Sequence, residues 1–143
     1  MDSLLLCYNF RGWCFMSGVY ERWRFGTDND KLVKLVLNGD KRATTSLYDE
    51  YVTNNEKVPK VGDRSIILFD DERDACLIEN VEVIVTEFKN ITEDLAFIEG
   101  EGDKSLAYYR DEHIRIFKSI DTNFCDESKV VFEVFKVVEK YDF

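Results

Sequence analysis

Histidine and proline are scarce in this chain of 143 residues, which has one of each, His113 and Pro59. Its four cysteines are scattered and form no C-x-x-C pair. A zinc site of cysteine and histidine would have almost no ligands, so we expect neither a metal nor another cofactor. Scattered cysteines in a chain of this length are typical of buried thiols in a reducing compartment.

Long apolar runs are also missing. Leu4–Tyr8 is too short to span a membrane, and the first residues lack the basic leader and the small-residue cleavage site of a signal peptide. We therefore expect a cytoplasmic protein that binds no membrane. Residues 1–15 are apolar and aromatic without a period and end just before Met16, which predicts an N-terminal extension upstream of a natural start at Met16.

No repeat, low-complexity stretch or flexible linker divides the rest, so residues 16–143 are expected to form a single domain.

The formal net charge of -10 is unevenly spread. Residues 1–60 are nearly neutral, and the acidic excess lies in residues 61–143. Because an acidic body repels a long phosphate backbone, a nucleic-acid partner should be small or should contact only the N-terminal half. The acidic residues are also consistent with a role in solubility alone.

Alternating apolar and polar positions predict strands, and apolar positions three or four apart predict helices. The pattern predicts an α+β fold in which a small curled sheet or barrel is crossed by short helices. Strands are expected at 43–46, 64–69, 75–88 and 130–138. A helix is expected through Leu32–Leu37, with the cap-type residues Asp28 and Asn29 before it and Gly39 closing it. Further helices are expected from a capping box at Asn90 through Ile98, and from about Ser105 to Ile120.

The segment Gly39–Ser46 carries the first candidate chemistry. Lys41 lies three residues before Thr44, and a cation near a hydroxyl can activate a nucleophile or stabilise an oxyanion. The alternative is structural, because a cation after a helix C-terminus complements the helix dipole and threonine suits strands.

Glu99 is the second candidate. A carboxylate at a helix C-terminus faces the negative end of the dipole, which predicts a raised pKa and is typical of an acid–base residue. The alternative is that Glu99 points into water and that Gly100 merely ends the helix.

Two other places have similar alternatives. Trp23, Arg24 and Phe25 interleave aromatic rings with a cation, as a base-stacking surface does, but they also suit the edge of a core. His113 lies four residues after Tyr109 on the apolar face of its helix, so we expect it to be buried.

Five motifs occur in order, and together they closely resemble the bacterial ASCH domain family over about residues 20–138. They are Trp23–Gly26, Gly39–Thr44, Lys60–Asp63, Ala96–Asp103 and Ser105–Arg110. The resemblance implies a PUA-like curled β-barrel with short helices packed around it. The Gly100–Asp103 motif and the helix that follows are similar to the longer branch of the family.

Members of this family include an amidohydrolase that deacetylates N4-acetylcytidine, and others are ribonucleases or RNA binders. The resemblance implies that Lys41, Thr44 and Glu99 are catalytic. It implies a substrate-binding set of Trp23, Arg24, Phe25, Arg42, Thr45 and Ser105.

The leading hypothesis is an amidohydrolase that removes an acyl group from an N-acylated pyrimidine nucleoside. The alternatives are a non-catalytic domain that binds RNA or a modified nucleobase, and a ribonuclease. The expected partner is a small nucleoside or short single-stranded RNA.

Overall fold

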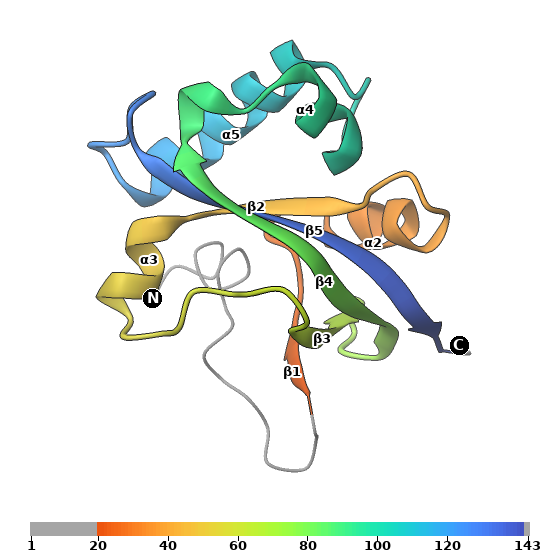
Figure 1. Ribbon diagram of the computed structural model, residues 1–143. Coiled ribbons are helices and arrows are strands. Elements are labelled where there is room, and N and C mark those ends of the chain that lie inside the picture. The colour runs from red at the N-terminus through yellow and green to blue at the C-terminus, as the bar shows by residue number, and fades with distance from the viewer. Residues whose placement is uncertain (1–19, 142–143) are drawn as a thin grey trace.

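The computed structural model describes residues 20–141. Ten elements follow one another along the chain (Figure 1): β1 (Glu21–Trp23), α2 (Asn29–Leu37), β2 (Ala43–Leu47), α3 (Tyr48–Thr53), β3 (Arg64–Leu68), β4 (Asp74–Glu87), the 3-10 helix η1 (Phe88–Asn90), α4 (Glu93–Glu99), α5 (Leu106–Ile120) and β5 (Lys129–Lys140).

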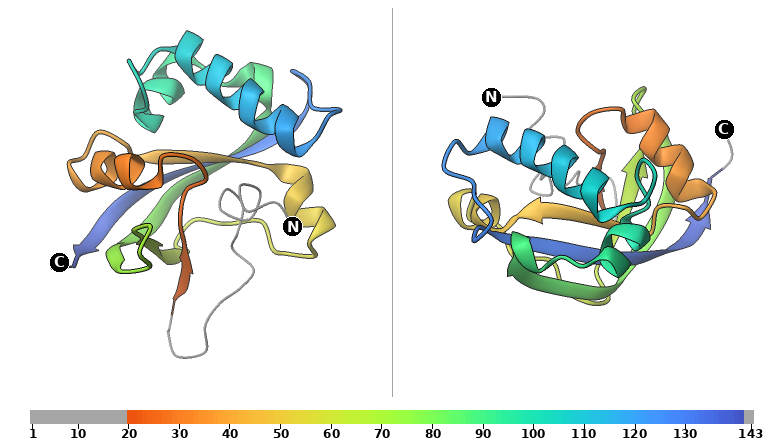
Figure 2. Two further views of the ribbon diagram at one scale, coloured as in Figure 1. Left: turned by 180° about the vertical axis from the view of Figure 1, so that it is seen from behind. Right: turned by 90° about the horizontal axis from the view of Figure 1, so that it is seen from above.

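The five strands form one sheet in the order β1-β3-β4-β5-β2. Only β1 and β3 run parallel; the other neighbours are antiparallel. The long strands β4 and β5 carry register shifts at Leu77/Ile78 and Asn80/Glu82. Bulges of this kind bend a strand and increase its twist, which curls the sheet into the half-barrel visible in Figure 2.

Helices cover both faces of the sheet (Figures 1 and 2). On one face, α4 and α5 bury a core that includes Phe88, Phe117 and Phe132. On the other, α2 contributes Val33 to a second core that includes Ile78 of β4 and Phe135 of β5. The fold is therefore α+β, as the sequence pattern predicted.

One helix start differs from the sequence expectation. Thr92, and not Asn90, caps α4, because its hydroxyl accepts a hydrogen bond from Leu95 N. Asn90 lies in η1 and donates to Thr86 instead. Asp28 occupies the N-cap position of α2 with a φ of 53° and without a side-chain capping bond.

Two short elements, α3 and β1, were not predicted. Each has too few residues to show a period in the sequence.

The expectation of buried thiols holds for Cys76, whose burial raises its pKa to about 11, but is wrong for Cys125, which is exposed. The proposed extension at residues 1–15 and the start at Met16 lie outside the described residues. No helix within residues 20–141 is long and apolar enough to cross a bilayer.

Candidate functional site

Lys41 follows the tight turn that ends α2. Gly39 adopts a left-handed conformation there, and the backbone N–H groups of Asp40 and Lys41 both donate to the Leu35 carbonyl. The turn directs the Lys41 side chain inward, where it is fully buried. Its Nζ lies 2.8 Å from the Ala43 carbonyl, 3.4 Å from the Glu99 carbonyl and 2.6 Å from Glu101 Oε2. All three donor positions of the ammonium therefore have a partner.

Glu99, at the end of α4, is the centre of a buried polar network and is 1% exposed. Its Oε2 accepts a hydrogen bond of 2.6 Å from Thr45 Oγ1 and lies 3.1 Å from His113 Nε2. Because the Thr45 hydroxyl donates to the carboxylate, the Tyr109 hydroxyl, 2.9 Å away, donates to Thr45. The network thus joins β2, α4 and α5.

The protonation of His113 follows from its contacts. Nδ1 lies 2.7 Å from the Tyr109 carbonyl, which can only accept, so Nδ1 carries a hydrogen. Nε2 then faces a carboxylate oxygen, and that contact is favourable only if a proton lies between the two atoms. Glu99 and His113 therefore share a proton in a space closed to water.

The environment sets the pKa of both groups. Burial alone would raise the pKa of Glu99, but the charges of His113 and Lys41 and the hydrogen bonds from His113 and Thr45 outweigh it and lower this pKa. Burial would lower the pKa of His113, yet the Glu99 carboxylate raises it. The expected raised pKa of Glu99 is thus wrong, because these contacts outweigh the helix dipole.

Thr44 lies on the opposite face of the sheet from this network. Successive strand residues point to opposite faces, and Thr45 points toward Glu99. Thr44 pairs across the strands with Glu133 of β5, which accepts a hydrogen bond from Asn80 of β4. The structure therefore brings Lys41 and Glu99 together, and strand alternation directs the Thr44 side chain to the face of the sheet opposite Glu99.

The residues of the expected substrate-binding set are spread over several places. Trp23 and Phe25 are 2% and 3% exposed, and Trp23 Nε1 donates to Ser65. Arg24 lies near the Asp70 carbonyl. Ser105 caps α5 by accepting from Tyr108 N.

The motifs Gly39–Thr44 and Ala96–Asp103 meet at the end of α4. Gly100 ends this helix with a φ of 81°, and a Cβ there would lie 1.9 Å from the Asp40 carbonyl oxygen. The Arg42 N–H donates to the Ile98 carbonyl, and Lys104 forms an ion pair of 2.9 Å with Asp40. The motifs Gly39–Thr44 and Ala96–Asp103 are therefore two sides of one packed junction.

A groove of about 320 Å³ runs along the other side of the loop that contains Lys41. Its charged lining consists of cations only: Lys41, Arg42, Lys136 and Lys140. Leu37 and Val137, both half-buried, provide apolar surface between them. In an acidic chain, this surface favours an anion.

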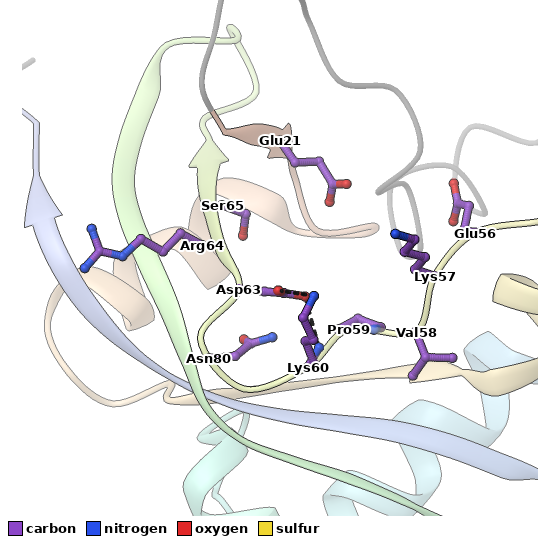
Figure 3. A pocket seen from close by; sticks show the side chains of 10 residues that line it. All are labelled: Glu21, Glu56, Lys57, Val58, Pro59, Lys60, Asp63, Arg64, Ser65 and Asn80. Carbon is purple, nitrogen blue, oxygen red and sulfur yellow. Dashed lines mark hydrogen bonds and ion pairs between the residues drawn. The ribbon is translucent and has the colours of Figure 1, made fainter.

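A second cavity, of about 410 Å³, lies between β1, β3, β4 and the loop before β3 (Figure 3). It is lined by Glu21, Glu56, Lys57, Val58, Pro59, Lys60, Asp63, Arg64, Ser65 and Asn80. Through the Asn80–Glu133 hydrogen bond, this pocket lies on the Thr44 face of the sheet. Within residues 20–141, no group of three or more His, Cys, Asp or Glu side chains is arranged to hold a metal ion.

Sequence reasoning missed the structural partners Glu133 and Asn80. Glu133 is the one carboxylate within the apolar run Val130–Phe135, and an acid in such a run signals a buried polar contact. Strand alternation could also have placed Thr45 with Ala43 and Leu47, toward α4 and α5.

Comparison with known proteins identifies a family and a fold for this chain. A family model described as the ASCH domain matches residues 21–139. The chain is similar to the crystal structure of an ASCH domain from Lactobacillus crispatus JV V101, with 32% sequence identity, a TM-score of 0.77 and coverage of 83% of this chain and 81% of that chain. It is also similar to a protein of known structure from Enterococcus faecalis V583, with 30% identity, a TM-score of 0.77 and coverage of 84% and 77%. Among curated proteins, none matches the chain.

Proposed function

Because the chain belongs to the ASCH domain family and has its PUA-like fold, we propose that it binds short single-stranded RNA in the groove lined by Lys41, Arg42, Lys136 and Lys140. The observation that carries this proposal is the charge of the groove: three exposed cations, Arg42, Lys136 and Lys140, and no carboxylate line it, in a chain with a net charge of -10, whereas the Lys41 ammonium is buried and paired with Glu101. Phosphate contacts by Lys and Arg supply most of the affinity of non-specific nucleic-acid binding.

The size and surroundings of the groove favour a short ligand. A volume of about 320 Å³ suits one or two nucleotides. The acidic remainder of the molecule repels a longer backbone. Leu37 and Val137 offer an apolar surface for a ribose or the face of a base.

The salt dependence of binding to a fluorescent oligouridine tests the proposal. Three exposed cations, Arg42, Lys136 and Lys140, are available for phosphates. For single strands the logarithm of the association constant falls by roughly 0.7 per phosphate contact for each tenfold increase in salt, so we expect a slope of about −2. A slope near zero, or no binding at low salt, would contradict the proposal.

Charge-neutralising variants locate the site. Arg42→Gln and Lys136→Gln should each weaken binding and reduce the slope by roughly 0.7. Lys118→Gln is the matched control, because Lys118 is an exposed cation on α5, outside the groove. An equal loss of affinity in the control would indicate non-specific attraction. Intact RNA on a gel after incubation would separate binding from ribonuclease activity.

A second candidate is the amidohydrolase, with an N-acylated pyrimidine nucleoside such as N4-acetylcytidine as substrate. One observation favours it: the Thr44 hydroxyl is buried, and no group within residues 20–141 engages it in a hydrogen bond. An unengaged hydroxyl can act as a nucleophile. In this reaction Thr44 Oγ1 would add to the acyl carbon, the C–N bond would break as the amine gains a proton, and water would hydrolyse the acyl-threonine.

Release of cytidine from N4-acetylcytidine, followed by chromatography, tests the second candidate. Thr44→Val keeps the branched shape and removes the hydroxyl, so it should abolish release without unfolding the strand. Cytidine release no faster than in buffer alone would rule the candidate out.

A further inference from the structure

The pocket of Figure 3 differs from the groove in its charge. Three carboxylates, Glu21, Glu56 and Asp63, and three cations, Lys57, Lys60 and Arg64, line it. Lys60 forms an ion pair with Asp63, and Arg64 forms one with Glu79 just outside the lining. Because the charges balance, the pocket has no electrostatic preference for an anion and suits a neutral ligand.

Asn80 supplies the most buried polar group of this pocket and is 4% exposed. Its Nδ2 lies 2.9 Å from Glu133 Oε1, and since a carboxylate oxygen accepts, this contact fixes which end of the amide is the nitrogen. No group within residues 20–141 bonds to the Oδ1 or to the second N–H of Asn80. An acceptor and a donor therefore remain for a ligand.

Ser65 adds another donor in the same lining. Its Oγ accepts a hydrogen bond of 2.8 Å from Trp23 Nε1, so its own hydrogen remains to be donated. Among the described residues, no acceptor takes that hydrogen. Val58 and Pro59 contribute apolar wall opposite these groups (Figure 3). Ligand sites commonly combine apolar walls with a few fixed polar groups of this kind.

We infer that this pocket is a second binding site, for a neutral planar molecule whose edge carries an N–H donor beside an acceptor, as an uncharged nucleobase or nucleoside does. The amide of Asn80 pairs with that edge, because a primary amide and such an edge match donor to acceptor and acceptor to donor. Glu133 holds the amide in position, and Ser65 donates to a second acceptor of the ligand. The site is independent of the groove, whose cations select phosphate.

Titration of the isotope-labelled full chain with uridine, monitored by backbone amide NMR, tests the inference. We expect shifts of amides in residues 57–65 and at Asn80, with an affinity that does not change between low and high salt. N3-methyluridine, which lacks the N–H, should bind about tenfold more weakly because a buried acceptor is left unpaired. Equal binding of the two nucleosides would overturn the inference.

A pair of matched variants localises the site. Val58→Trp should fill the pocket and abolish the shifts while removing no hydrogen bond of the protein. Val52→Trp, at a position on α3 that is 64% exposed and outside the lining, should bind uridine as the unmodified chain does. Absence of shifts at millimolar uridine, shifts confined to Arg42 and Lys136, or binding unaffected by Val58→Trp would each overturn the inference. RNA binding in the groove can persist or fail in any of these cases, so the two proposals are tested separately.

Discussion

Glu99 and His113 are both 1% exposed, and each makes the charge of the other tolerable. An isolated ion in such a space would carry a large desolvation cost, whereas a paired ion with further hydrogen bonds carries a much smaller one. Thr45 and the Tyr109 carbonyl provide those further bonds. At the scale of single residues, the contacts of Glu99 and His113 accordingly stabilise the packing of α4 against α5.

The pH dependence of stability should report this pair. The pKa of His113 is raised above 6.5, so its contribution is complete below pH 6.5 and is lost as the pH rises through the folded-state value. The pKa of Glu99 is lowered below 4.5, so its contribution is present above pH 4.5 and is lost on acidification. We expect the unfolding free energy of the unmodified chain to fall between pH 6 and 9 more steeply than that of His113→Gln, as measured by urea titration. Equal slopes would show that the pair does not titrate together.

Thr44 and Thr45 should respond differently to loss of the hydroxyl. Thr45→Val removes one of the buried hydrogen bonds of Glu99, which keeps His113, and removes the partner of the Tyr109 hydroxyl within the described residues; leaving such a buried group unpaired typically costs about 1–3 kcal/mol. Thr44→Val removes no hydrogen bond within the described residues and should change stability by less than about 1 kcal/mol. Urea unfolding of both variants provides the comparison, and equal destabilisation would contradict the assignment of faces.

The sequence predicted the environment of a single residue only where the spacing of its neighbours along one helix or strand determines that environment. His113 is buried as its spacing from Tyr109 predicted, because both positions share one face of a regular helix. The partners of Glu99 come from β2 and α5, and no local rule states which threonine of a Thr-Thr pair faces a helix that follows much later in the chain. The pKa of Glu99 is lowered, and not raised as the helix-dipole argument had predicted, because its partners come from elements distant in the sequence.

At the scale of elements, the contact between the α4 terminus and the loop after α2 is the tightest backbone approach involving a glycine. Gly100→Ala combines a left-handed φ with a Cβ 1.9 Å from a backbone oxygen, so the junction must shift. We expect a loss of at least about 2 kcal/mol by thermal or urea unfolding. Gly62→Ala is the control, since Gly62 has a φ of 92° but no atom within 4 Å of an added Cβ. Equal losses would mean that backbone conformation alone matters.

Long periodic elements were predictable, and short ones were not. The strands β4 and β5 and the helix α5 fell close to their expected ranges, because each repeats its pattern several times. The capping box at Asn90 was wrong because Thr92, two residues later, has a hydroxyl that can cap as the Asn90 amide can, and the 3-10 turn at η1 decides between them. Turns of this kind depend on tertiary packing, which a local pattern does not contain.

At the scale of the whole molecule, the order of the strands in the sheet predicts how slowly their backbone amides exchange with solvent. β5 has a neighbour on each side, β4 and β2, whereas β1 has three residues and, within residues 20–141, pairs with one strand, β3. Native-state hydrogen exchange should therefore find the slowest amides in β5, at Val131–Phe135, and fast exchange in β1. Faster exchange in β5 than in β1 would be inconsistent with the position of β5 between β4 and β2.

The interior strand β5 is also the last of these five to leave the ribosome. In the finished sheet, Ala43 of β2 pairs with Val134 of β5, and Val85 of β4 pairs with Val131 of β5. Until β5 has been synthesised, β2 has no described strand beside it there, and β4 has only β3. Until then the nascent chain displays two unpaired strand edges, which are templates for pairing with other chains. A polypeptide that stops before residue 129 would keep both edges open permanently, so premature termination should yield aggregates rather than a weakened domain. Conversely, a separate peptide carrying Lys129–Lys140 is the natural complement of such a fragment, and supplying it in trans would reconstitute the sheet from two pieces.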